Sequence, residues 1–264
     1  MLGIFRSLWQ YRHFVLSSIR NELKSRFARS KLGGLWMIIN PLAQVAIYAL
    51  ILSNVLAAKL PGVESTYAYA TYLMAGLLAW TLFNEIISRC LNLFIEQGNL
   101  MKKMSFPRIT LATIVVGSCL LNNILLLASM MGIFIILGQQ FSANMLWLIP
   151  LTFIVISLAL GIGLILGVMN VFVRDIGQVT PIVLQMIFWF TPIVYPANII
   201  PEGYRHLLVF NPMQPLVAGY QDVLVFGRAP QLDGLLGISL FAVGLLLLSL
   251  FLFRRASEEM VDAL

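Results

Sequence analysis

Few residues in this sequence are of the types that carry out covalent chemistry, and they are widely scattered. Its two histidines, His13 and His206, lie far apart in the chain, and its two cysteines, Cys90 and Cys119, follow no disulfide or metal-ligand spacing. No G-x-x-x-x-G-K-S/T loop, which would cradle a nucleotide phosphate, occurs anywhere. We therefore expect no catalytic residue, no metal and no cofactor in this chain, and no hydrolysis of nucleotide by it.

Two charged pairs stand out because they lie beside long apolar segments. Glu85 precedes Arg89 by four residues, a spacing that brings two side chains together on one helix. Arg174 and Asp175 are adjacent, in a short polar interruption between apolar runs. We favour a structural ion-pair role for all four residues. Contact with substrate headgroups is the alternative for Glu85.

Aromatic side chains gather near the ends of the apolar segments. The most prominent are Tyr48, Trp80, Phe83, Phe188, Trp189, Phe190 and Tyr195. Trp and Tyr at these positions commonly form a belt at the membrane interface. Aromatic faces also stack against sugar rings, but position alone favours the belt.

The elements that position these residues must lie in a membrane. Of the 264 residues, 60% are hydrophobic and 11% are charged, whereas roughly 25% are charged in a soluble domain. Six apolar segments approach or exceed the length needed to cross the hydrocarbon core. Each must be helical, because lipid offers no hydrogen-bonding partner to unpaired backbone N–H and C=O groups. The predicted spans are residues 36–58, 67–88, 109–137, 146–172, 179–195 and 232–253. The fold class is therefore an all-α integral membrane protein.

The distribution of basic residues predicts the orientation. If the N-terminus is cytoplasmic, every Lys and Arg except Lys59, Arg205 and Arg228 lies on the inner side. The positive-inside rule then places both termini in the cytoplasm, and His13 and His206 on opposite sides of the membrane. This topology and anionic lipid account for the net charge of +6. No nucleic-acid partner is needed.

The segment before the first span, residues 1–35, is expected to be a cytoplasmic helix lying in the membrane interface. Its apolar positions share one helical face and alternate with basic residues, a pattern typical of interfacial helices; they are Leu16, Ile19, Leu23 and Phe27. Gly33 and Gly34 break this helix and permit a sharp turn into the first span. Residues 36–264 then form a single membrane domain.

Two segments outside the spans have patterns of their own. In residues 96–106, Leu100, Met101 and Met104 share a helical face, which suits docking in a partner's groove or packing on the membrane surface. In residues 198–227, Asn211 is placed as a helix N-cap, Pro212 at the first helical position, and Gly227 just past the end.

The second helix of residues 198–227 has an apolar face formed by Leu216, Tyr220, Val223 and Leu224. Two short helices here would either dip into the outer leaflet as a lid or form a plain outer loop. Pattern alone does not separate these two arrangements.

Several short motifs together resemble a known family, the polysaccharide-export branch of the type-2 ABC transporter permeases. They are RFARSKLGGLW at residues 26–36, Asn40-Pro41, Asn99-Leu100, Phe106-Pro107, FVRDI at residues 172–176, TPIVYP at residues 191–196 and Asn211-Pro212. Each is weak alone, but their order on a six-span topology is specific. The resemblance covers nearly the whole chain.

The resemblance implies a division of labour between subunits. Two copies of the permease form the pathway in the bacterial plasma (inner) membrane, and two cytoplasmic ABC ATPases bind ATP and Mg. Residues 96–106 become the helix that couples to the ATPase, and residues 198–227 the outer gate. The substrate is an undecaprenyl-diphosphate-linked polysaccharide surrounded by membrane lipid.

The resemblance also implies roles for particular residues. The coupling residues would be Glu96, Asn99, Leu100, Met101, Met104 and Phe106. Those facing the lipid diphosphate, where the substrate enters, would be Arg29, Lys31, Leu32, Gly33 and Gly34. The polymer channel would be lined by Tyr48, Phe188, Trp189 and Tyr195, and the outer gate would use Pro201, Asn211, Pro212, Leu216 and Tyr220.

The resemblance favours O-antigen as the polymer, with capsule and teichoic acid as alternatives. A small-amphiphile exporter is the alternative within transporters. A membrane-bound lipid-modifying enzyme would need acid–base or metal-binding residues clustered at one membrane face, and the sequence does not supply them. A scaffold without transport activity would leave the Arg174-Asp175 and Asn211-Pro212 motifs unexplained.

Overall fold

A computed structural model of the chain describes residues 9–26, 31–32, 35–47, 68–98, 107–138, 142–197 and 200–263. Within these ranges all regular elements are helical. The α-helices are α2 (Arg12–Arg26), α3 (Trp36–Ile47), α5 (Ala68–Glu96), α7 (Ile109–Ile136), α8 (Leu148–Phe172), α9 (Asp175–Phe190), α10 (Glu202–Arg205), α11 (Gln214–Leu224) and α12 (Leu232–Ala263). Two 3₁₀ turns, η3 (Ala143–Trp147) and η5 (His206–Phe210), precede α8 and follow α10. The predicted all-α class is confirmed for this part of the chain.

Among the described residues, four helical segments are long and apolar enough to cross a membrane, and each overlaps a predicted span. They are Ala68–Glu96, Ile109–Ile136, Ala143–Phe172 and Leu232–Ala256. The chain is therefore a multi-pass membrane protein. Of the first predicted span, residues 36–58, the structure describes only the part within α3, which has 12 residues. The total of six spans stays a prediction.

The fifth predicted span, residues 179–195, differs from the structure at both ends. Helix α9 runs from Asp175 to Phe190 and has 16 residues. Thr191 leaves the helix with an extended backbone. Pro192 favours this early end, because proline lacks a backbone N–H donor and disfavours the helical conformation of the residue before it, Thr191. The TPIVYP motif is thus a turn rather than the end of a span.

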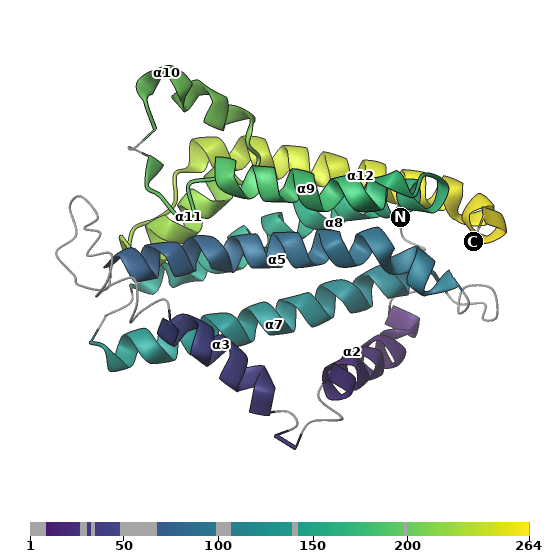
Figure 1. The fold of residues 1–264 in the computed structure, drawn as a ribbon, viewed down its shortest axis with the longest axis horizontal. Helices are drawn as coiled ribbons and strands as arrows, with labels where there is room; N and C mark the ends of the chain where they lie inside the picture. The colour runs from purple at the N-terminus through teal and green to yellow at the C-terminus, as the bar shows by residue number, and fades with distance from the viewer. Residues whose placement is uncertain are drawn as a thin grey trace.

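Helix α5 is the central element of the bundle, as Figure 1 shows. It packs against α7 on one side and α8 on the other, with α12 beyond α8. Helix α9 contacts α5 and α8, whereas α3 and α2 contact α7. Most of α5 is buried inside the chain, but much of the apolar surface of α9 and α12 is exposed. Those two helices therefore present the faces available to lipid or another protein.

The two ends of the bundle carry different parts of the chain. Helix α2, the Glu96 end of α5 and the C-terminal end of α12 lie at one end (Figure 1). Helices α10 and α11 lie toward the other end. Both α5 and α12 continue past the predicted spans toward the α2 end, reaching Glu96 and Ala263. The Glu96 end of α5 and helix α2 therefore lie at the same end of the bundle.

Helices α5 and α8 approach closely at two glycines of α8. A Cβ atom added at Gly163 would lie 2.8 Å from Cys90 Cβ, and one added at Gly167 would lie 2.4 Å from the Cys90 carbonyl oxygen. Glycines four residues apart commonly permit such close contact between membrane helices. The absence of a side chain at these positions thus sets the α5–α8 distance.

We expect Gly167→Ala to lower the free energy of unfolding by about 1–3 kcal/mol, because the new methyl group must displace the α5 backbone. Thermal unfolding of the purified protein in detergent would measure the effect. Gly132→Ala on α7 is the matched control, since a Cβ there meets nothing within 4 Å. Equal stability of the two variants would show that α5 and α8 can separate without cost.

Candidate functional site

An ion pair connects the N-terminal helix to the centre of the bundle. Arg89 Nη2 of α5 lies 2.5 Å from Glu22 Oε1 of α2, and about a quarter of each side chain is exposed. Ser118 of α7 donates a hydrogen bond to the other Glu22 oxygen at 2.8 Å. Arg89 Nη1 also donates to Cys119 Sγ at 3.7 Å. Three helices therefore meet at one charged contact.

Glu85 continues this polar cluster toward the middle of the membrane. Its Oε1 accepts a hydrogen bond from Asn122 Nδ2 at 3.0 Å and lies 3.9 Å from Arg89 Nη1. Beside it, Asn123 Nδ2 donates to the Leu78 carbonyl at 2.8 Å. The i,i+4 pair seen in the sequence is thus present, but the shorter contact of Arg89 is the one to Glu22. An ionisable group within a span is costly unless it is paired or functional.

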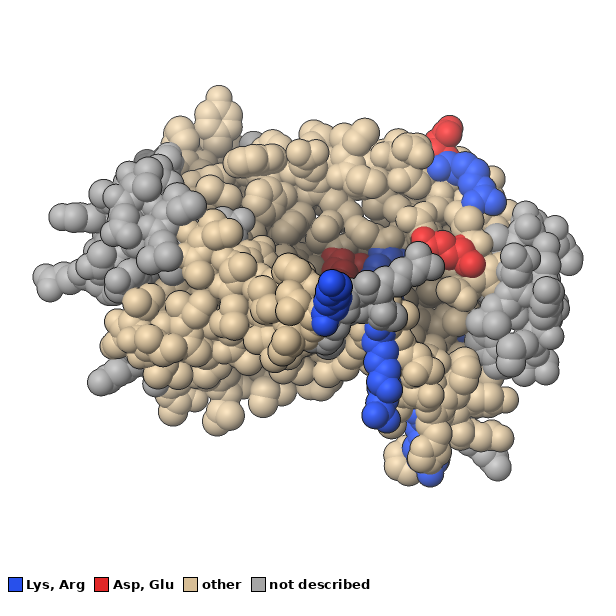
Figure 2. Space-filling model, turned by 60° about the horizontal axis from the view of Figure 1, so that its bottom comes forward, with Lys and Arg blue, Asp and Glu red and all other residues tan. Residues whose placement is uncertain are grey.

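A cavity of about 250 Å³ opens beside Glu85, between α3, α5 and α7. Its polar lining residues are Asn40, Gln44, Thr81, Glu85, Asn122 and Asn123. Trp36 and Pro41 of α3 also border it. Figure 2 shows a broader hollow on the face of the molecule that carries α2, α3 and α7, with acidic and basic side chains together in it. Polar groups of three helices therefore converge on one space within the membrane region.

A second cavity, of about 530 Å³, lies nearer the α2 end of the bundle. Its lining includes Glu22 of α2, Arg89 and Glu96 of α5, and Leu111 of α7. The Glu22–Arg89 pair thus borders this cavity, and Glu85 borders the one between α3, α5 and α7. The last turn of α5 forms part of its wall.

The residues predicted to meet the lipid diphosphate fall largely outside the described part of the chain. Arg29, Gly33 and Gly34 are not described. Lys31 and Leu32 form an exposed turn, in which the Leu35 N–H donates to the Leu32 carbonyl at 3.1 Å. Helix α3 begins at Trp36, directly after Leu35.

The residues predicted to couple to an ATPase begin where α5 ends. Glu96 is the last residue of α5 and is exposed. The other five predicted coupling residues lie outside the described residues; they are Asn99, Leu100, Met101, Met104 and Phe106. The described structure therefore places only the start of this segment, Glu96, at the α2 end of the bundle.

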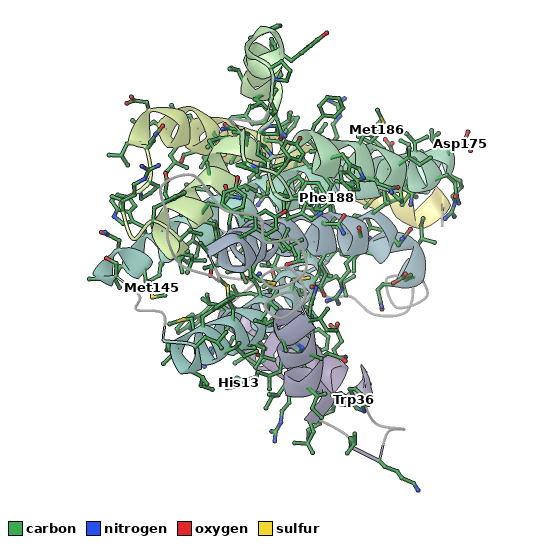
Figure 3. The ribbon with its side chains drawn as sticks, turned by 60° about the vertical axis from the view of Figure 1, so that its left-hand side comes forward. His13, Trp36, Met145, Asp175, Met186 and Phe188 are labelled. Atoms are coloured by element: carbon green, nitrogen blue, oxygen red, sulfur yellow. The ribbon has the colours of Figure 1, made fainter. Side chains whose placement is uncertain are left out.

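The predicted channel aromatics do not share one surface. The Phe188 side chain of α9 points toward the bundle interior, where its ring centroid lies 5.4 Å from that of Trp80. Met186, on the same helix, points away from the bundle (Figure 3). Trp189 is 57% exposed. Tyr195 donates its hydroxyl to the Trp189 carbonyl at 2.5 Å. Phe188 thus contributes to packing within the chain, while Trp189 is open to lipid, substrate or another subunit; Tyr48 is not described.

The turn at residues 191–196 is held by side chains from two other helices. Tyr69 and Tyr72 of α5 donate to the Val194 and Pro192 carbonyls, at 2.5 and 3.2 Å. Gln221 Nε2 of α11 donates to the Pro192 carbonyl at 3.0 Å. These donors replace the helical N–H groups that a proline-containing turn lacks. The Ala68 end of α5 and helix α11 are therefore tied to the end of α9.

The predicted outer-gate residues belong to two different environments. Pro201 is exposed before α10, which projects from the bundle in Figure 1. Leu216 and Tyr220 are buried on α11, as are Val223 and Leu224. The predicted apolar face of this helix is therefore confirmed as a buried face. Burial raises the pKa of Tyr220 to about 12, and its hydroxyl lies 2.6 Å from that of Thr152 on α8.

The predicted start of this helix was wrong by two residues. Asn211 is not its N-cap, and Pro212 is not its first residue, because α11 begins at Gln214 with Pro215 in its first turn. Instead, Asn211 Oδ1 accepts from the Met213 N–H at 3.0 Å, and Asn211 Nδ2 donates to Thr191 Oγ1 at 2.8 Å. Asn211 therefore joins the 191–196 turn to the approach of α11, a role that short side chains of this type favour.

The other candidate chemistry of the chain is sparse. Arg174 and Asp175 are exposed at the start of α9, and no ion pair joins either to another described residue. His13 and His206 lie on separate elements, α2 and η5. Over the described ranges no group of three or more His, Cys, Asp or Glu residues could hold a metal ion.

Sequence reasoning missed several residues of this arrangement. Glu22 was not recognised as the partner of Arg89, and neither Tyr72 nor Gln221 was singled out. Two signals were available. Glu22 is the single acidic residue in the basic amphipathic segment, and Pro192 and Pro196 interrupt the backbone hydrogen bonding of residues 191–196, so that carbonyl oxygens there need donors from elsewhere. Pairing them required the three-dimensional arrangement of α2, α5 and α11.

Comparison with known proteins gives a consistent result over most of the chain. The sequence model of the family described as ABC-2 type transporter matches residues 14–225. The chain is 29% identical to the O-antigen export system permease protein RfbA of Myxococcus xanthus, over the whole of both chains. It is 28% identical to a protein of the same name from Klebsiella pneumoniae, over 78% of each chain. It is 25% identical to the polysialic acid transport protein KpsM of Escherichia coli, over 92% of this chain and 93% of that one.

Proposed function

Because the chain belongs to the ABC-2 type transporter family, we propose that it is the permease subunit of an ATP-driven exporter of lipid-linked polysaccharide, with O-antigen as the polymer. The observation that carries this proposal is the similarity to an O-antigen export permease over the full length of both chains. In this role the chain supplies the membrane pathway. A separate ATPase subunit binds ATP and Mg and supplies the energy.

The proposed location is the inner membrane, with six spans and both termini in the cytoplasm. The basic residues of the described structure support this orientation. They cluster at the end of the bundle that carries α2 and the end of α12, and include Arg20, Lys24, Arg108, Arg254 and Arg255. The positive-inside rule assigns that end to the cytoplasm. Lys31 and Leu32, with Arg29, Gly33 and Gly34, would then face the headgroup region where a lipid diphosphate enters.

The proposed assembly has two copies of this chain and two ATPase subunits. The exposed apolar faces of α9 and α12 support contact with a second copy as well as with lipid. On α9 the exposed side chains include Ile182, Met186 and Trp189. A pathway between two copies would expose the polymer to Trp189 and Tyr195, which suits the stacking of sugar rings on aromatic faces.

The proposed mechanism depends on α5, which is one uninterrupted helix from Ala68 to Glu96. Its inner end leads directly into the segment that would dock on the ATPase. Its outer end holds the 191–196 turn through Tyr69 and Tyr72. Closure of the ATPases would therefore tilt a rigid helix and shift the outer turn together with α11. Export would proceed by repeated cycles of this motion.

We expect the double substitution Tyr72→Phe with Gln221→Leu to loosen the outer turn, because both donors to the Pro192 carbonyl are lost. Leaving a buried carbonyl unpaired costs about 1–3 kcal/mol. This cost is enough to raise the fraction of molecules in which the 191–196 turn is open about tenfold. Entry of o-nitrophenyl-galactoside into cells that lack lactose permease would report the leak. Tyr195→Phe, which removes only the bond to the Trp189 carbonyl, is the control. A tight membrane in the double variant would argue against a gating role for this turn.

Two measurements test the proposed function directly. Deleting the gene in its own cell should abolish surface O-antigen, seen as loss of the ladder on a lipopolysaccharide gel, and supplying it from a plasmid should restore the ladder. Purification in mild detergent should also yield a stoichiometric ATPase with a phosphate-binding loop, identified by mass spectrometry. Recovery of the chain alone together with an unchanged polymer would refute the proposal.

Export of a capsule polysaccharide is the second candidate, favoured by the similarity to a polysialic acid transport protein over most of both chains. The same deletion separates the two possibilities, because the polymer that disappears from the surface identifies the substrate. Loss of capsule with an intact lipopolysaccharide ladder would select the second candidate.

A further inference from the structure

The cavity between α3, α5 and α7 has open hydrogen-bonding groups on one wall. Asn40 and Gln44 lie one turn apart on α3 and both line the cavity. Neither amide has a hydrogen-bonding partner among the described residues, and both side chains are exposed. An amide group offers two donors and one acceptor oxygen. This wall therefore presents unused donors and acceptors to whatever occupies the cavity.

The opposite wall is held in place by hydrogen bonds between α5 and α7. Asn122 is fixed against Glu85 at 3.0 Å, and Asn123 against the Leu78 carbonyl at 2.8 Å. These bonds connect the two helices, as polar groups in membrane bundles often do. The α3 amides make no such connection. Helix packing thus accounts for one wall but not for the other.

The depth of the cavity makes a polar occupant necessary. Asn122 lies at the middle of α7 and Glu85 lies close to the middle of α5, and both helices are long and apolar enough to cross a membrane. A polar group that faces hydrocarbon without a partner costs several kcal/mol. The α3 amides therefore favour an occupant that forms hydrogen bonds over a lipid chain.

The types of side chain identify the occupant as a sugar rather than a phosphate. Sugar hydroxyls can donate to the Glu85 carboxylate and can both donate to and accept from the amides of Asn40 and Gln44. Trp36 borders the cavity and supplies an aromatic surface for the C–H face of a pyranose ring. No Lys or Arg occurs among its described lining residues, whereas phosphate sites are typically built from cationic donors.

We propose that this cavity binds one sugar residue of the exported polymer inside the permease. The inference rests on the proposed function for the class of substrate. It places a sugar site within a single chain, between α3, α5 and α7, in addition to the pathway between two copies. Binding would use Asn40, Gln44 and Glu85, with Trp36 at the border of the site.

The test uses the full-length permease with its ATPase partner in lipid nanodiscs. The probe is the mixture of oligosaccharides released by mild acid from the surface polysaccharide of the source cell. Saturation-transfer-difference NMR detects weak sugar binding, and we expect a signal from wild type that falls about fivefold or more in Asn40→Leu and in Gln44→Leu. Ala43→Leu adds a leucine to the same exposed helix outside the cavity and should keep the wild-type signal.

Three results would overturn the inference. They are an undiminished signal in both α3 variants, the absence of any signal in wild type, and binding of inorganic pyrophosphate that is lost in the same variants. An export assay in cells separates this inference from the proposed function. Export by wild type without sugar binding at the cavity refutes only the site, whereas sugar binding without export of any surface polymer refutes the proposed function.

Discussion

Replacing Arg89 with methionine is expected to release α2 from the bundle. The substitution leaves the Glu22 and Glu85 carboxylates near each other with no cation between them. Breaking a fully buried ion pair from one side costs about 3–5 kcal/mol, and a quarter of each side chain is exposed here, so we expect about 2–3 kcal/mol. Thermal unfolding would measure this loss. Limited proteolysis should show faster cleavage in residues 9–26, because the contact that holds the helix is gone.

Two further variants make this prediction specific. Glu22→Gln combined with Arg89→Met should recover part of the lost stability, because it removes one of the two carboxylate charges that Arg89 contacts. Arg20→Met removes a cation from the exposed side of the same helix and should change stability by less than about 0.5 kcal/mol. If Arg89→Met and Arg20→Met proved equally stable, the contact between α2 and α5 would contribute nothing to the fold.

The long spans could be predicted from the sequence because the membrane imposes a simple rule. Every backbone group in the hydrocarbon core must be paired within its own segment, so an apolar run of sufficient length must be a helix. Residues 109–137 and 146–172 obey this rule, and the structure forms helices there with nearly the same bounds. The rule does not predict where a helix ends when a proline occurs within the apolar segment. For that reason the predicted span 179–195 extended five residues too far.

Contacts between helices were much harder to predict. The i,i+4 spacing of Glu85 and Arg89 describes only neighbours on one helix, whereas the shorter contact of Arg89 is to Glu22, on a different helix. Similarly, nothing in the aromatic pattern set Tyr69 and Tyr72 apart from belt residues. Their role follows from the open carbonyls of the 191–196 turn, which need donors from another element. Such pairings depend on which helices become neighbours.

These contacts give α5 a consistent role along its length. The half of α5 nearer α2 carries the Glu22–Arg89 pair, its middle carries Glu85, and its Ala68 end holds the 191–196 turn through tyrosine hydroxyls. Close packing at Gly163 and Gly167 of α8 holds the half nearer α2 in place laterally. Because α5 is one continuous helix, a displacement at Glu96 would shift the α5 side of every one of these contacts. This continuity is the structural reason for expecting large effects from the loop that follows α5.

We accordingly expect Leu100→Asp or Met104→Asp to abolish export while leaving the chain in the membrane. Each change places a carboxylate on the apolar face predicted to dock in a groove of the ATPase. Burying an unpaired carboxylate there costs several kcal/mol and should weaken the association about 100-fold or more. Surface polymer measures export, fractionated membranes measure insertion, and ATPase recovered with the tagged permease measures association.

Lys102→Asp is the matched control, because Lys102 lies on the side of the predicted helix away from Leu100 and Met104. It introduces the same carboxylate in the same loop and should retain association with the ATPase. An equal loss in this variant would show that the charge of the loop, rather than its apolar face, governs docking. Normal export by the Leu100→Asp and Met104→Asp variants would remove residues 96–106 from the coupling mechanism, and α5 would then have to receive its displacement through α2 and the Glu22–Arg89 pair.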